Sequence, residues 1–281
     1  MLWQRVVTAV ILLLVLLPAL LYPSPEPFNL VAMVFIIAAT WEWARLSGLG
    51  PVPSLITGAV GGAACALAWA AGLLDLNLHW LWAAAGVVWV LGGSWLLRGG
   101  ADSWRAVPRT VRLCLGVVLL CVAWLAVAQA RIAGVNYLLS VMALVWMADI
   151  GAYFAGRRWG GRWVTRKLAA SISPGKSWEG VVGGMVGVLL LYVAWRWADG
   201  FWQAGTGSLY TQLADSLGWL AVPALLGLTA MSVAGDLLES LVKRVAGVKD
   251  SSGLLPGHGG VLDRLDALLP TVPLALLLHA L

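Results

Sequence analysis

Most of the side chains that could do chemistry lie in one polar segment, Gly235 to Asp266. It contains five acidic residues and, beside them, five basic or imidazole residues: Asp236, Glu239, Asp250, Asp263 and Asp266, with Lys243, Arg244, Lys249, Arg264 and His258. Acids and bases in nearly equal number indicate a site that binds both a metal ion and an anion. A segment that only anchored the protein to a membrane surface would be basic alone.

The carboxylates of this segment fall on two predicted helices. The first, which we expect to begin at Asp236, places four polar residues on one face at spacings of three and four: Asp236, Glu239, Ser240 and Lys243. The second opens near Val261 and carries Asp263 and Asp266 on one face. Two carboxylates from separate helices can hold one hard cation and leave positions for substrate phosphates. A solvated helix end with a Glu239–Lys243 pair, worth only about 0.2–0.5 kcal/mol, explains the first pattern as well.

A glycine-rich stretch, Lys249 to Gly260, connects the two helices. Gly257, Gly259 and Gly260 would let backbone amides approach a phosphate closely, and a helix N-terminus just after them would favour an anion. A tight connecting turn explains the same glycines equally well. For His258 in this loop, direct chemistry, a substrate contact and a structural hydrogen bond all stay open.

The stretch from Ser240 to Asp266 reads S-x-V-K-R-x4-K-D-x-S-x2-L-P-x-H-G-G-V-x-D-R-L-D. It resembles the signature of the phosphatidate cytidylyltransferase (CDP-diacylglycerol synthase) family along its full length. Two upstream segments resemble motifs of the same family: SPGKSWEG at Ser173–Gly180, and DIGAYFAG at Asp149–Gly156. The first 100 residues carry no motif that resembles the family.

The upstream motifs also allow interpretations that do not depend on this family. Gly175-Lys176-Ser177 echoes a phosphate-binding P-loop, but Ala170 stands where the first glycine belongs and no strand precedes it, so we reject a P-loop. Asp149 lies within an apolar run, where ionisable residues are usually functional because their burial is costly. A hydrogen bond between two helices is the alternative role for Asp149.

The resemblance implies that CTP and phosphatidate react to CDP-diacylglycerol and diphosphate, with Mg²⁺ and a second, monovalent cation, K⁺, as cofactors. We expect Mg²⁺ ligands at Asp236 and Asp263, with Asp266 or Asp250 in support. Four residues are predicted to be catalytic: Asp236, Asp263, Lys176 and Lys243. Nine more are predicted to bind substrate: Ser173, Ser177, Arg244, Lys249, Asp250, His258, Gly259, Gly260 and Asp149.

The composition predicts a membrane protein. The 281 residues are 61% hydrophobic and only 11% charged, whereas a soluble domain carries about 25% charged residues. The long unbroken apolar runs predict an all-α polytopic fold rather than a β-barrel. We expect nine spans of about 20 residues: Val6–Leu21, Phe28–Leu46, Ser54–Leu74, Trp80–Leu97, Val111–Ala130, Tyr137–Ala155, Gly180–Trp197, Leu217–Ala234 and Ala267–Leu281.

The basic residues set the expected orientation. With the N-terminus in the cytoplasm and nine spans, 16 of the 18 lysines and arginines fall on the cytoplasmic side, and only Arg131 and Arg196 fall on the other. This distribution predicts an integral protein of a bacterial inner membrane with its active site on the cytoplasmic face. The net charge of +5 is spread between apolar runs, so we expect no nucleic-acid partner.

We expect one membrane domain over residues 1–281, with N-terminal spans in 1–135 and the motif-bearing spans and loops in 136–281. The family resemblance, not the hydropathy, implies a homodimer. Three other functions stay open: a nucleotidyltransferase for another lipid phosphate or nucleotide, a transporter with Asp149 as its ion site, and a non-catalytic scaffold. The transporter is the weaker alternative because the polar groups concentrate in cytoplasmic loops rather than at mid-membrane.

Overall fold

The computed structural model describes residues 2–279 and is helical, with no β-strand in that range. The predicted all-α fold is therefore confirmed. The elements in chain order are α1 (Leu2–Leu21), α2 (Glu26–Leu46), α3 (Pro51–Ala70), η1 (Leu73–Asp75), α4 (His79–Val87), η2 (Val88–Gly92), α5 (Gly93–Ala106), α6 (Arg109–Ala133), α7 (Val135–Trp159), α8 (Trp178–Phe201), α9 (Leu209–Leu217), η3 (Gly218–Leu220), α10 (Ala221–Val245), α11 (Leu262–Leu265) and α12 (Leu268–His279).

Eight helical stretches among these residues are long and apolar enough to cross a membrane, by length and composition. They correspond to the first eight predicted spans. The expected ninth span, Ala267–Leu281, is the 12-residue helix α12, with Pro273 inside it, and residues 280–281 lie outside the described part. Most of α12 is buried against α4, α6, α7 and α10, so it packs within the helix assembly.

Helix α10 differs from its prediction in a way that matters for the site. We expected a span ending at Ala234 and a new helix beginning at Asp236, but α10 runs unbroken from Ala221 to Val245. A helix has no reason to stop at Gly235 when its neighbours hold it, since a single interior glycine costs only about 1 kcal/mol. The polar face from Asp236 to Lys243 is therefore the end of a membrane-length helix.

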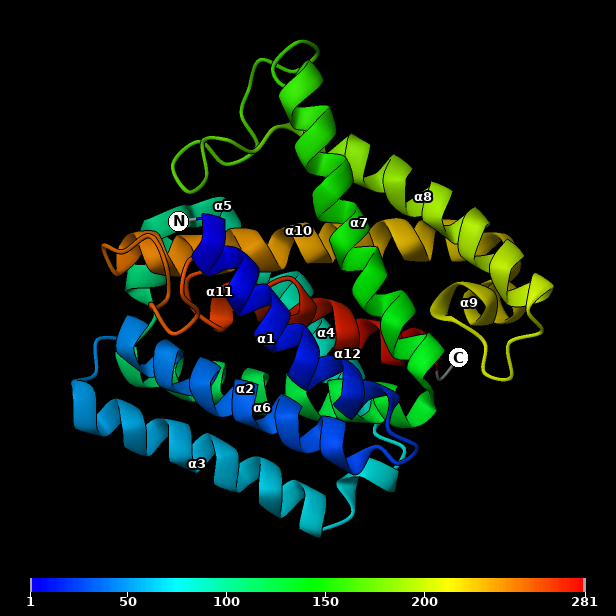
Figure 1. The fold of residues 1–281 in the computed structure, drawn as a ribbon. Coiled ribbons are helices and arrows are strands. Elements are labelled where there is room, and N and C mark those ends of the chain that lie inside the picture. Colours follow the sequence, from blue (N-terminus) through cyan, green and yellow to red (C-terminus); the bar gives the residue numbers. More distant parts are fainter. Residues whose placement is uncertain (1, 280–281) are drawn as a thin grey trace.

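Helices α7 and α8 pack through small residues. A Cβ atom added at Gly151 would lie 2.6 Å from the carbonyl oxygen of Gly183, and one at Gly184 would lie 2.7 Å from that of Ala148. Such close backbone approach is typical of helix pairs in membranes. Figure 1 shows α7 and α8 running in different directions from the loop of residues 160–177, with α7 crossing α10 and with α2, α3 and α6 below α10 in this view.

Candidate active site

A cavity of about 450 Å³ opens between α7, the start of α8 and α10. Four residues predicted from the motifs line it, and they are called the cavity group below: Asp149, Lys176, Ser177 and Asp236. The sequence motifs around these residues are up to 87 positions apart, so the fold brings them together as predicted. Tyr153 and Arg157 also line the cavity, and the Arg157 guanidinium donates to the Tyr153 hydroxyl over 2.9 Å.

The cavity group is organised around one ion pair. The ammonium of Lys176, from the loop before α8, contacts a carboxylate oxygen of Asp236 on α10. Both side chains remain partly exposed, at 26% and 31%. The Ser240 hydroxyl donates to the other Asp236 oxygen over 3.4 Å. Because this pair faces an open cavity, an arriving anion or cation can exchange partners with it.

Asp266 lies beside the turn of α10 that carries Asp236. A Cβ atom added at Gly235 would lie 2.4 Å from the Asp266 carbonyl oxygen, so α10 and the start of α12 meet at this glycine. Burial, and then the negative charge of Asp236, raise the pKa of the Asp266 carboxyl to about 7. Burial and the nearby negative charge therefore both disfavour the ionised form of Asp266.

Asp263 is held differently from Asp236. One of its oxygens accepts from the Lys243 ammonium over 2.5 Å, and the other accepts from the Gly260 amide over 2.7 Å. The amide and the hydroxyl of Ser251 also donate to that second oxygen, over 2.9 and 3.0 Å. Burial alone would raise the pKa of Asp263, but hydrogen bonds from Glu239, Lys243 and these amides lower it to about 2.

Lys243 joins α10 to this carboxylate. Its ammonium contacts both Glu239, one helical turn earlier, and Asp263. The three side chains are buried, with exposed fractions of 13%, 4% and 7% for Lys243, Glu239 and Asp263. The solvated Glu239–Lys243 pair considered from the sequence is thus replaced by a buried three-way ion contact.

Glu42 on α2 has a role that we had not predicted. Its side chain is fully buried, and its carboxylate accepts from the amides of Val261 and Leu262 over 3.0 and 2.6 Å. It also accepts from the hydroxyls of Ser251, over 3.0 Å, and Ser252. One carboxylate therefore joins the middle of the loop between α10 and α11 to the start of α11. An acidic residue inside the apolar run Phe28–Leu46 was the available signal.

Glu42, Glu239, Lys243, Ser251 and Asp263 are called the buried cluster below. Two of the residues predicted to be catalytic, Lys243 and Asp263, belong to this cluster. Among residues 2–279, no group of three or more His, Cys, Asp or Glu side chains is arranged to hold a metal ion by itself. Asp236 and Asp263, expected to share one cation, are each paired with a different lysine.

The glycines of the loop have a structural role that differs from the predicted one. The Gly260 amide donates to Asp263, and the next two amides donate to Glu42, so the start of α11 already has anionic partners from the protein. A Cβ atom at Gly260 would lie 2.5 Å from a Glu42 carboxylate oxygen, and one at Gly259, where φ is +88°, would lie 2.8 Å from an Asp263 oxygen. These glycines make room for carboxylates of the protein, and the expectation that they approach a phosphate stays a prediction.

Ser177 and Glu179 shape the wall of the cavity. The Ser177 hydroxyl is the N-cap of α8 and accepts from the Gly180 amide over 3.2 Å. Glu179, buried at the start of α8, accepts from the amides of Trp163 and Val164 over 2.9 and 3.0 Å. It thus holds the loop of residues 160–177, a role that we had not predicted from its motif. Ser173 does not line the cavity; its carbonyl accepts from the Lys176 amide over 3.2 Å.

The remaining predicted residues lie around the connecting loop. The Arg244 guanidinium donates to the carbonyls of Ile172 and Val248, over 3.4 and 3.5 Å, and so ties two loops together. Lys249 and Asp250 are exposed and lie outside the cavity lining. The carbonyl of His258 accepts from the Arg264 guanidinium, while its imidazole Nδ1 is buried without a hydrogen-bond partner among the described residues.

Comparison with known proteins agrees with this arrangement. The model of the Cytidylyltransferase family matches residues 3–281. A phosphatidate cytidylyltransferase of Pseudomonas aeruginosa is 38% identical over 282 aligned residues, which cover 97% of this chain and 95% of the relative. Relatives of the same name from Haemophilus influenzae and Brucella suis are 46% and 43% identical, over 50% and 52% of this chain and 44% and 48% of the relatives. This integral membrane protein therefore belongs to the Cytidylyltransferase family.

Proposed function

We propose that this protein is a phosphatidate cytidylyltransferase, which forms CDP-diacylglycerol and diphosphate from CTP and phosphatidate. The observation that carries the proposal is the Lys176–Asp236 pair at the wall of a cavity between membrane-length helices. Lys176 belongs to a motif that resembles this family, Asp236 lies four residues before the Ser240–Asp266 signature, and a relative aligned over 97% of this chain bears this enzyme name. A lysine and a carboxylate side by side suit a substrate that brings phosphates together with a cation.

The reaction depends more on electrostatic stabilisation of the phosphates than on proton transfer. A phosphate oxygen of phosphatidate attacks the α-phosphorus of CTP, and the bond from that phosphorus to diphosphate breaks. A phosphate monoester has its second pKa near 6, so the attacking group is already largely dianionic and needs no strong base. The obstacle is the approach of two polyanions, so positioning and charge neutralisation should supply most of the catalysis.

The carboxylates next to the cavity fit the predicted Mg²⁺. Mg²⁺ is usually held by one or two carboxylates, with waters and substrate phosphates completing its ligands. Asp236 on α10 and Asp266 in the turn before α12 are suited to form such a pair, because the two segments meet at Gly235, next to Asp236. When bound there, Mg²⁺ would draw negative charge from the CTP phosphates and the leaving diphosphate. All four acceptor contacts of Asp263 come from the protein, so we assign Asp263 a supporting place beside this pair.

The chain's own cations would neutralise the phosphates. Lys176, from the loop before α8, and Arg157, on α7, both line the cavity, so a triphosphate bound there would meet two positive charges. On binding, Lys176 would exchange Asp236 for phosphate oxygens, which frees Asp236 for its cation. The Ser177 hydroxyl lies in the same wall and can donate one hydrogen bond while it still caps α8.

The membrane setting suits both substrates. The cavity lies near the ends of α7 and α10 that carry Arg157, Arg158, Lys243 and Arg244, as the positive-inside rule requires of a cytoplasmic face. CTP would arrive from the cytoplasm, and the phosphate of phosphatidate would lie at headgroup level. We therefore place the protein in a bacterial inner membrane with this face inward. A K⁺ site and a homodimer stay predictions from the family resemblance.

A substrate panel tests the proposal. The purified protein is incubated with each of the four nucleoside triphosphates and with phosphatidate or another lipid phosphate, with and without Mg²⁺. We expect CDP-diacylglycerol from CTP and phosphatidate alone, and only with Mg²⁺. A larger turnover with another nucleotide or another lipid phosphate would show a different nucleotidyltransferase, and the absence of lipid product from every pair would refute the enzyme assignment.

A further inference from the structure

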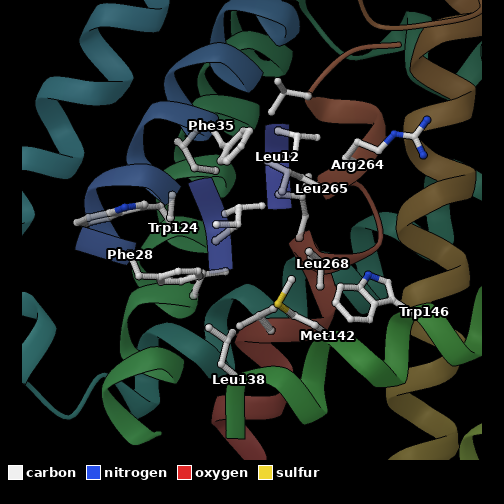
Figure 2. Close-up of a pocket in the computed structure, with 18 of the residues that line it drawn as sticks. Leu12, Phe28, Phe35, Trp124, Leu138, Met142, Trp146, Arg264, Leu265 and Leu268 are labelled. Carbon is white, nitrogen blue, oxygen red and sulfur yellow. The ribbon is translucent and has the colours of Figure 1, made fainter. Parts of the chain in front are cut away.

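A second pocket, almost wholly apolar and about 270 Å³ in volume, lies beside the site (Figure 2). It is enclosed by α1, α2, α6, α7 and the segment from the connecting loop to α12. Ligand pockets usually have volumes of about 300–1,000 Å³, so this one suits a narrow ligand. The catalytic chemistry described above does not use it.

The pocket is elongated along the helices. Leu138, Met142 and Trp146 of α7 line it at intervals of four residues, and Phe28 and Ile36 mark a similar length of α2. At about 1.5 Å per residue, eight residues correspond to about 12 Å. In Figure 2, Phe35 and Leu265 lie toward one end, with Leu138 toward the other. The pocket therefore runs from the level of the connecting loop toward the membrane interior.

One end of the pocket adjoins the cavity group and its carboxylate pair. Trp146 lines the apolar pocket and Asp149 lines the cavity, three residues later on α7. Leu265 lines the pocket, and the next residue, Asp266, meets α10 at Gly235, the residue before Asp236. A single amphiphilic molecule can therefore place a charged group by the carboxylates and an apolar chain in the pocket.

The one charged residue among those that line the pocket is Arg264, on α11. Its guanidinium donates to the His258 carbonyl and points away from the apolar side chains (Figure 2). A positive group at the loop end of an apolar pocket matches an anionic lipid, whose charge and tails are separated in the same way. Arg264 also has donor groups beyond those that contact His258, since a guanidinium carries five N–H groups.

Helix α1 separates the pocket from the bilayer. Leu12 and Leu16 face the pocket, whereas neighbouring side chains such as Leu13 and Leu14 are 53% and 68% exposed. Near its start, α1 is held by hydrogen bonds from Arg5 and Thr8 to the carbonyls of Gly257 and Pro256, in the connecting loop. These hydrogen bonds join α1, which forms one wall of the pocket, to the connecting loop, which covers one end of it.

We propose that this pocket holds one acyl chain of the phosphatidate whose phosphate reacts at the cavity, an inference that rests on the proposed function. The second chain stays in the bilayer, because the pocket has room for one. The pocket then selects for chain length: a long chain gains contacts along α2 and α7 that a short chain cannot reach. Short-chain and long-chain phosphatidates would differ in KM far more than in the chemistry at phosphorus.

Two substitutions on α1 form a matched test. Leu12→Trp fills the pocket, and Leu14→Trp places the same bulk on the exposed side of the same helix. Activity is measured with dioleoyl and with dihexanoyl phosphatidate at saturating CTP and Mg²⁺. We expect Leu12→Trp to lower the ratio of kcat/KM for the long over the short substrate about tenfold, and Leu14→Trp to leave it unchanged. Tenfold corresponds to about 1.4 kcal/mol, which is the transfer free energy of roughly two methylene groups.

An equal ratio in the two variants, or an equal loss with both substrates in Leu12→Trp, would overturn the proposal. Photolabelling keeps it testable if Leu12→Trp fails to fold. Wild-type protein is labelled with phosphatidate that carries a diazirine at the end of one chain. We expect labelled peptides from α2 and α7 around Phe28 and Leu138, and loss of the label with excess dioleoyl phosphatidate but not with dioleoyl phosphatidylethanolamine.

Equal competition by both lipids would identify an ordinary bilayer lipid and would contradict the proposal. The two failures are separable. A wild-type protein that forms no lipid product from CTP refutes the proposed function, whatever the labelling shows. A wild-type protein that forms CDP-diacylglycerol but shows no chain-length effect of Leu12→Trp refutes only the acyl-chain pocket.

Discussion

The cavity group and the buried cluster share charge types and each include residues of α10, yet they are built in opposite ways. In the cavity group, Lys176 and Asp236 have one another and open space. In the buried cluster, Asp263 and Glu42 each have four protein contacts and little exposure. The difference teaches that a motif rich in acids and bases contains both reacting groups and groups that hold the loop in shape.

The comparison predicts that changes in the buried cluster cost stability first and that changes in the cavity group cost activity first. Lys243→Met should have the largest effect, because it leaves Glu239 and Asp263 buried without their cation. Removing one partner of a buried ion pair costs about 3–5 kcal/mol. Thermal unfolding in detergent should show a large fall in Tm. Lys167→Met, on an exposed residue, is the control, and similar Tm values for both variants would erase the distinction between the two regions.

Asp236→Asn should give the largest loss of activity at nearly constant stability. Loss of one preorganised electrostatic partner of a reacting group typically lowers turnover by about 10²–10³. CDP-diacylglycerol formation is measured against Mg²⁺ concentration, and the variant should need more Mg²⁺ as well as turn over more slowly. Asp102→Asn, whose side chain is 95% exposed, controls for loss of a negative charge. Near-normal turnover of Asp236→Asn would remove it from the metal site.

Glu42→Gln should lower stability and activity together. The amide replaces an anion that accepts four hydrogen bonds, and one hydrogen bond to a charged group contributes about 1.5–3 kcal/mol. We expect a loss of about 2–3 kcal/mol and at least a tenfold fall in kcat, since the loop before α11 loses its common acceptor. Glu26→Gln, an exposed acid at the other end of α2, should change neither. A normal Tm with a reduced kcat in Glu42→Gln would contradict a supporting role and would indicate that Glu42 takes part in the reaction itself.

Ser177→Ala should have the smallest effect of the four. It removes the N-cap of α8, a change that costs about 0.5–2 kcal/mol. If Ser177 serves only as a cap, kcat/KM for CTP should fall no further than the change in Tm explains, and Ser177→Thr should restore both. If Ser177→Thr restored Tm but not kcat/KM, the Ser177 hydroxyl would also contact substrate. That result would assign Ser177 to the residues of the cavity group that bind substrate as well as to those that hold the fold.

Much of the fold and part of the site could be read from local patterns. Apolar runs of about 20 residues predicted the spans, because the bilayer imposes that length. Two motifs and the polar segment that begins at Gly235 predicted Lys176, Asp149 and Asp236 as site residues, and all three line one cavity. The pairing of each carboxylate could not be predicted. Periodicity gives the face of a helix, but the partner of Asp263 depends on how the loop folds back, and Asp236 turned out to pair across to another segment.

Glu42 shows a second limit on what can be predicted from the sequence. Its partners lie 209 to 220 residues further along the chain, in the connecting loop and α11. A carboxylate in an apolar helix indicates that the residue has a role. It does not identify the partner, because the neighbouring residues carry no information about which distant amides will donate to the carboxylate. The ninth predicted span failed for a related reason: Ala267–Leu281 is apolar because α12 is packed among other helices, not because it is long enough to cross a bilayer.

The separation between Glu42 and its loop has a consequence for biosynthesis. The N-terminal helices are made and inserted before the ribosome has reached residue 251, so during that interval the Glu42 carboxylate has none of its four native donors. Contacts between distant parts of a chain form late because closing the long intervening loop costs entropy. The site should therefore be completed as one of the last steps of maturation, when α11 and α12 reach α2, and a chain stalled before that point would be inserted but inactive.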